Sequence, residues 1–114
     1  MPPRKNPLKL NKLQLRTLAL MQELARHPDT SSHDAQTGES LLTVLPHPHG
    51  DHVHVGGLVV SARDASGFQN EAVWIALQRK GLIRAAFPRA VTLTAQGKAY
   101  DTGLLDPVAQ PSDH

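Results

Sequence analysis

Apolar residues near the start of the chain recur at the spacing of an α-helix. One helical face carries the apolar residues Leu13, Leu20, Met21 and Leu24, together with Thr17. Leu15 and Leu18 widen this stripe into a broad apolar face. Asn11 and Gln14 have the spacing of a reciprocal helix cap, in which each side chain bonds the backbone of the other residue. The pattern therefore predicts a helix over residues 12–26.

A second helical pattern lies in the second half of the chain. Its apolar positions recur three and four residues apart: Phe68, Ala72, Val73, Ala76 and Leu77. Ser66 is a suitable N-cap, with Gln69 placed to return the hydrogen bond. Gly81 can adopt the left-handed conformation that closes a helix, and the two basic residues before it suit the negative end of the helix dipole. These signals predict a helix over residues 67–80.

Two short strand patterns follow this helix. They cover residues 82–87 and 90–94 and are separated by a Pro-Arg pair, which disfavours helix and favours a tight reversal. We therefore expect a β-hairpin. Thr94 is a suitable N-cap for a last short helix that runs through Tyr100.

The middle of the chain predicts loops and strands. Residues 27–39 are a polar run typical of a loop. Residues 41–46 and 52–61 are rich in β-branched side chains, and the segment between them has the Pro, Gly and Asp of a turn. A β-hairpin over residues 41–60 is the favoured interpretation, and a short helix over 55–62 is the alternative.

The second half of the chain resembles a known DNA-binding family. A helix ending in Lys-Gly-Leu-Ile at residues 80–83, a hairpin, and a Leu-Thr-x-x-Gly helix start at residues 93–97 resemble the winged helix-turn-helix domains of small bacterial transcription regulators. The resemblance covers residues 8–26 and 66–101. It implies an α+β fold in which helix 67–80 is the recognition helix. The middle segment departs from the family, because a β-rich insert with a glycine pair stands where a second helix is expected.

The resemblance also bears on the oligomeric state. First helices of such regulators often serve a second subunit as well as their own domain, which implies a homodimer through the helix over residues 12–26. The alternative is that the whole apolar stripe belongs to the core of one chain.

Composition sets further bounds. At 114 residues we expect one winged-helix-like domain, 1–114, with frayed polar ends at 1–7 and 106–114. Six basic residues against one acidic residue make the first 26 positions basic, and five against one do so for 67–100. The absence of cysteine excludes disulfides, thiolate metal sites and cysteine nucleophiles. The sequence has no apolar run long enough to span a membrane and no signal-peptide pattern, so we expect a cytoplasmic protein.

For DNA binding, the resemblance implies that the helix over 67–80 enters the major groove. The side chains able to read base edges are Gln69, Asn70 and Gln78. The candidates for phosphate contact are the basic residues Arg63, Arg79, Lys80, Arg84, Arg89 and Lys98, with an N-terminal arm of Arg4 and Lys5.

Two residues of this helix fit DNA poorly. Glu71 would repel phosphate unless it accepts a hydrogen bond from cytosine, and Ile75 is expected to face outward. Both favour the alternative that the scaffold is a protein-interaction module. Trp74 is expected in the core.

A histidine cluster forms the other candidate site. Its members are His47, His49, His52 and His54. If residues 52–55 are extended, His52 and His54 share one face while the valines between them face the core. Such a set suits Zn²⁺, Ni²⁺ or Cu²⁺ and predicts a metal-binding or metal-responsive protein, with Asp51, His33 or Asp34 as further ligands. A pH-responsive turn is another interpretation, because clustered imidazoles repel one another once protonated.

Enzymatic signatures are lacking. The sequence has no nucleophile elbow, P-loop, dinucleotide fingerprint or convincing carboxylate pair. We therefore expect a protein that is not an enzyme; the one catalytic form left would be a metal-assisted hydrolase built on the four clustered histidines.

Overall fold

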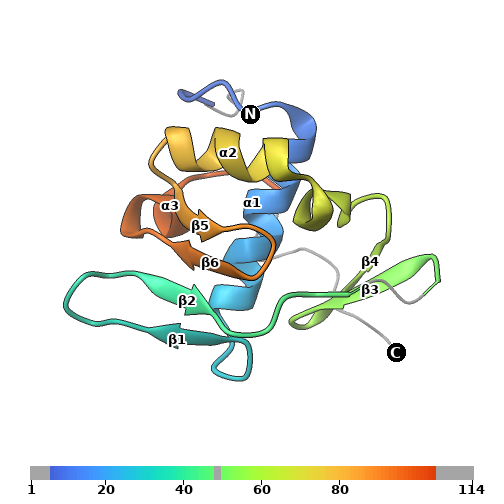
Figure 1. Cartoon of the computed structure of the whole chain (residues 1–114), viewed down its shortest axis with the longest axis horizontal. Coiled ribbons are helices and arrows are strands. Elements are labelled where there is room, and N and C mark those ends of the chain that lie inside the picture. The colour runs from blue at the N-terminus through green and yellow to red at the C-terminus, as the bar shows by residue number, and fades with distance from the viewer. Residues whose placement is uncertain (1–5, 48–49, 105–114) are drawn as a thin grey trace.

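Helix α1 (Lys12–Ala25) runs through the middle of the molecule, and the other elements pack around it (Figure 1). This computed structural model describes residues 6–47 and 50–104. Asn11 and Gln14 form the predicted reciprocal cap, with backbone-to-side-chain distances of 2.8 and 2.9 Å. The predicted helix is confirmed, and the chain has the predicted α+β class.

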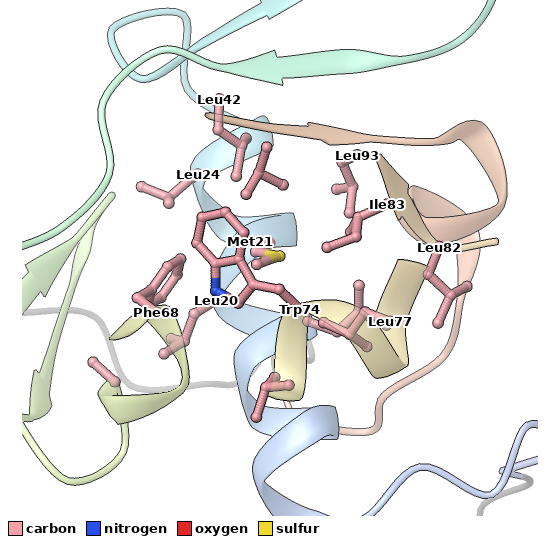
Figure 2. Close-up of a cluster of buried hydrophobic side chains, with 14 of the residues drawn as sticks. Leu20, Met21, Leu24, Leu42, Phe68, Trp74, Leu77, Leu82, Ile83 and Leu93 are labelled. Carbon is pink, nitrogen blue, oxygen red and sulfur yellow. The ribbon is translucent and has the colours of Figure 1, made fainter. Parts of the chain in front are cut away.

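The apolar stripe of α1 is packed inside this chain. Leu18, Leu20, Met21 and Leu24 are each at most 3% exposed. Figure 2 shows Leu20, Met21 and Leu24 among side chains from the sheet and from α2. These four residues therefore belong to the core of one chain, as the alternative prediction held. A homodimer through α1 stays a prediction.

One antiparallel sheet has four strands. These are β1 (Ser31–His33), β2 (Ser40–Leu42), β5 (Ile83–Ala86) and β6 (Ala90–Leu93), in the order β1-β2-β6-β5. Leu41 of β2 and Arg84 of β5 both pair with Thr92 of β6, and all three side chains face away from the core. The alternate residues Leu42, Val91, Leu93 and Ile83 are buried against the helices.

A separate two-stranded sheet contains β3 (His52–Val55) and β4 (Leu58–Ser61). The strand content of the middle segment was predicted correctly, but the pairing was wrong. Residues 41–46 do not pair with residues 52–61, because the glycine pair at 56–57 supplies the reversal and Gly56 has φ +57°. The alternative helix over 55–62 is also wrong.

The loop predicted over 27–39 is interrupted by β1. This strand pairs with β2 on the outside of the sheet, so its Ser-Ser-His sequence needs no apolar residue. The strand is missed by a reading based on hydrophobic alternation because only one of its edges is paired and its residues are half-buried or exposed.

The second predicted helix begins later than expected. A 3₁₀ turn, η1 (Ser66–Gln69), precedes helix α2 (Glu71–Arg79), and the side chain of Asn70, not Ser66, caps α2 by accepting from the Ala72 N–H at 3.1 Å. The reason lies at Gly67, where an added Cβ would lie 1.8 Å from Thr17 Oγ1 on α1. This close contact packs residues 66–69 against α1. The predicted end is confirmed, because Gly81 follows the helix with φ +77°.

The end of the described chain packs on α1. Helix α3 (Ala95–Ala99) is capped by Thr94, as predicted, and Gln22 of α1 donates to the carbonyl oxygens of Gly97 and Tyr100 at 2.9 and 2.7 Å. The Tyr100 hydroxyl bonds the Asn6 side chain and accepts from the Leu8 N–H at 3.2 Å. No helix in the described ranges is long and apolar enough to cross a lipid bilayer.

Candidate nucleic-acid interface

Helix α2 presents one side to the core and the other to solvent. Val73, Trp74 and Leu77 are buried. The exposed side chains are Glu71, Ala72, Ile75, Gln78 and Arg79. The outward position predicted for Ile75 and the core position predicted for Trp74 are both confirmed.

Trp74 fixes α2 relative to its surroundings. Its indole Nε1 donates to the Gly67 carbonyl oxygen at 3.1 Å, a bond that spans η1 and α2. Its ring also meets the Phe87 ring edge to face, with centroids 4.8 Å apart. Phe87 lies in the β5–β6 turn, so the aromatic pair holds this turn against α2.

The side chains predicted to read bases are partly committed to the fold. Asn70 Oδ1 accepts from the Ala72 N–H, and Gln78 Oε1 accepts from the Ala85 N–H at 2.8 Å. Each amide group of Asn70 and Gln78 keeps its NH₂ donors for another partner. Gln69 is exposed on η1. These three side chains therefore differ in how many of their polar atoms are left to bond DNA.

The predicted phosphate contacts fall into two groups. Arg79, Lys80 and Arg89 are exposed, and no carboxylate within the described residues pairs with them. Arg84 instead forms a 2.7 Å ion pair with Glu39, and Lys98 Nζ donates to His33 Nδ1 at 2.8 Å. Arg84 and Lys98, the second group, are therefore bonded to side chains of the β1–β2 hairpin.

The remaining basic candidates lie elsewhere. Arg63 is exposed on the segment between β4 and η1. Arg4 and Lys5 lie outside the described residues. The structure thus leaves Arg79, Lys80 and Arg89 as the basic side chains associated with α2 and the β5–β6 turn.

A hollow separates α2 from β5. We call it the α2–β5 hollow; it has a volume of about 160 Å³ and is lined by Glu71, Trp74, Ile75, Gln78, Ala85 and Phe87. Ile75 is 44% exposed at this hollow. An apolar residue and a carboxylate thus occupy the centre and the N-terminal end of the face on which DNA contacts were expected.

The histidine cluster is assembled only in part. His52 and His54 lie on the same side of β3, as predicted, with ring centroids 5.3 Å apart, while Val53 and Val55 are buried. His47 is exposed, and His49 lies outside the described residues. Among residues 6–47 and 50–104, no group of three or more His, Asp or Glu side chains is placed to hold a metal ion.

The residues proposed to complete a metal site have other neighbours. Asp51 lies 3.4 Å from His52 Nδ1, whereas His33, on β1 of the four-stranded sheet, accepts from Lys98 of α3. Asp34 Oδ1 accepts from the Gln36 N–H in the β1–β2 connection. His33 and Asp34 therefore belong to a different part of the molecule from the β3 histidines.

One polar centre was missed by the sequence reasoning. Glu23 is 8% exposed, and its Oε2 lies 2.7 Å from His27 Nε2 and 3.2 Å from the Gly57 N–H. A hollow of about 400 Å³ next to it is lined by residues of α1's end and of the β3–β4 turn: His27, Asp29, Thr30, His54, Gly56 and Gly57. Glu23 lies on α1 and His27 follows four residues later, just past the helix end. This spacing signals an ion pair but gives no indication of the β3–β4 turn that Glu23 also bonds.

Comparisons of this chain with protein-family models, with curated proteins and with solved structures found no match.

Proposed function

We propose that this chain is a DNA-binding domain of the winged-helix type, which contacts DNA through α2 and the β5–β6 turn. The observation that carries the proposal is a set of exposed cations around an exposed helix face, Arg79, Lys80 and Arg89, which have no ion-pair partner among residues 6–47 and 50–104. Cations of this kind neutralise phosphates and release counterions, which supplies affinity without regard to base sequence.

The size of α2 supports the proposal. Helix α2 has nine residues and is about 13 Å long, and an α-helix with its side chains is about 10–12 Å across, which fits a major groove about 12 Å wide. Arg79 and Lys80 lie at the C-terminal end of α2. The β5–β6 turn that carries Arg89 packs through Phe87 against Trp74, in the N-terminal half of α2. Cations therefore lie at the C-terminal end of the helix and on this neighbouring turn.

The order of the elements also supports a winged-helix scaffold. Strand β2 comes after α1 in the chain and pairs with β6. Strand β6 also pairs with β5, and these two strands form the hairpin that follows α2 in the chain. In this scheme β5 and β6 form the wing. The β3–β4 hairpin and η1 occupy the position in the chain where the family has its second helix.

Binding to mixed-sequence duplex DNA in a salt series tests the proposal. Affinity should fall by orders of magnitude between about 50 and 200 mM salt if several phosphates are contacted. The double variant Arg79→Ala/Lys80→Ala should weaken binding and reduce the slope of log affinity against log salt by about 2, because each lost phosphate contact removes about one unit.

Lys12→Ala provides the matched control, because Lys12 is an exposed cation at the start of α1. It should leave both the affinity and the salt slope nearly unchanged. An absence of binding at low salt would reject DNA as the partner. Equal effects of the control and the α2 variant would reject α2 as the contact surface.

A further inference from the structure

The α2–β5 hollow is a preformed feature of the surface. Its two sides are tied together because Gln78 on α2 accepts from the Ala85 N–H on β5. Trp74 and Phe87, which also line it, are fixed by the indole hydrogen bond to Gly67 and by their edge-to-face contact. A ligand entering this hollow would therefore meet side chains that are already ordered, which lowers the entropic cost of binding.

The hollow combines apolar surface with one negative charge. Ile75 is one of four large hydrophobic residues that are exposed in the described part of the chain, and it is the only one of them on a helix. Glu71 lines the same hollow, is exposed, and has no ion-pair partner within residues 6–47 and 50–104. A carboxylate beside apolar surface is complementary to a side chain with an aliphatic stem and a cationic head.

The charge on the exposed face of α2 changes sign along the helix. Glu71 lies at its N-terminal end, whereas Arg79 lies about 12 Å away at the other end of the same face, with Ile75 between them. DNA, which is uniformly negative, matches only the basic end of this face. A protein segment with a basic residue, an apolar residue and an acidic residue in succession matches all of it.

We propose that the α2–β5 hollow is a docking site for a protein segment that places a Lys or Arg side chain beside Glu71 and an apolar side chain on Ile75. Acidic residues of the same segment then face Arg79. The segment covers the face of α2 that we assign to DNA, so the two partners exclude each other. Only this last point rests on the proposed function; the docking site itself does not.

Selection from a random peptide library displayed on phage tests the docking site. Peptides retained by the wild-type chain, and not by the Glu71→Lys variant, should share a basic residue next to an apolar one. Synthetic copies should change the fluorescence of Trp74, which is the only tryptophan in the chain and lines the hollow. Glu71→Lys and Ile75→Asp should each weaken their binding about tenfold or more.

A charge exchange gives the sharper result. Replacing the basic residue of the selected peptide with Glu should abolish binding to the wild type and restore binding to the Glu71→Lys variant. Asp29→Lys is the matched control, because Asp29 is an exposed acid on the loop after α1, and it should leave peptide affinity unchanged. Thermal unfolding of each variant shows whether it is folded; if Ile75→Asp is not, the exposed Glu71→Lys substitution still decides.

The DNA assay separates this proposal from the proposed function. Glu71→Lys should strengthen DNA binding, since it replaces a repelled carboxylate with a cation, while it weakens peptide binding. If Glu71→Lys weakens peptide binding but does not strengthen DNA binding, the result contradicts the proposed function and not the docking site. The docking proposal fails if no peptide is enriched, if enriched peptides lack a basic residue, or if Ile75→Asp instead abolishes self-association, which would assign the hollow to a second copy.

Discussion

The side-chain oxygen of Gln78 accepts a hydrogen bond from the backbone N–H of Ala85, at 2.8 Å. Strand β5 is at one end of its sheet, and this N–H points away from its neighbour β6 toward α2. Gln78 thus satisfies a backbone donor of an edge strand and joins the helix to the hairpin. A side chain expected to read bases has a structural role in the free protein.

Replacing this side chain should loosen the hairpin. We expect Gln78→Ala to lower the free energy of unfolding by about 1 kcal/mol, the usual net contribution of one hydrogen bond. Urea denaturation measures the change. Gln36→Ala, at an exposed position in the β1–β2 connection, should have little effect. A Gln78→Ala variant as stable as the wild type would mean that the Ala85 N–H finds water without cost.

Gly67 should tolerate no larger residue. The Cβ of Gly67→Ala would lie 1.8 Å from Thr17 Oγ1, so η1 or α1 must move, and we expect a loss of about 1–3 kcal/mol in thermal or urea unfolding. The double variant Gly67→Ala/Thr17→Ala removes the clashing hydroxyl. It should recover part of this loss in a double-mutant cycle, and strictly additive effects would show that the two residues do not meet.

Glu23 should matter more to stability than an exposed acid. Glu23→Ala leaves the Gly57 N–H and His27 without their acceptor at a site that is 8% exposed, so we expect a loss of about 2–3 kcal/mol. Glu39→Ala breaks the exposed ion pair with Arg84 and should cost about 0–1 kcal/mol. Urea unfolding of both variants gives the comparison. Equal losses would show that Glu23 does not hold the β3–β4 turn.

The histidine cluster yields a prediction for metal binding. Stable zinc sites use three or four protein ligands, and the described residues bring together two imidazoles, those of His52 and His54. Elemental analysis of untagged protein for Zn²⁺, Ni²⁺ and Cu²⁺ tests the predicted site. One bound equivalent that disappears in the double variant His52→Ala/His54→Ala would establish it, and an equivalent that persists in this variant would place the metal elsewhere.

Local signals in the sequence were sufficient where the local interaction persists in the fold. The Asn11 cap, the Gly81 helix end and the Thr94 cap each involve residues within a few positions of one another, and each was predicted. The start of α2 was predicted wrongly because Ser66 and Asn70 are both good caps. The choice between them depends on the contact of Gly67 with α1, which lies about 50 residues earlier.

Long-range features were the ones that local patterns could not supply. Strand β2 pairs with β6, about 50 residues later, and the polar strand β1 exists because β2 is there to pair with it. The α2–β5 hollow and the position of Glu23 also depend on which segments meet. Composition predicted the basic character of α2's C-terminal end, but the pairing of Arg84 with Glu39 required the completed sheet.

The bonds between Tyr100 and residues 6 and 8 have a consequence for synthesis on the ribosome. The helix that begins at Lys12 leaves the exit tunnel early, yet Gln22 and the segment before it find their hydrogen-bond partners in residues 97–100. Leu20, Met21 and Leu24 of this helix pack among side chains that include Phe68, Trp74 and Leu93, so they stay uncovered until these later residues have been translated. During that interval the nascent chain exposes hydrophobic surface that the folded domain buries.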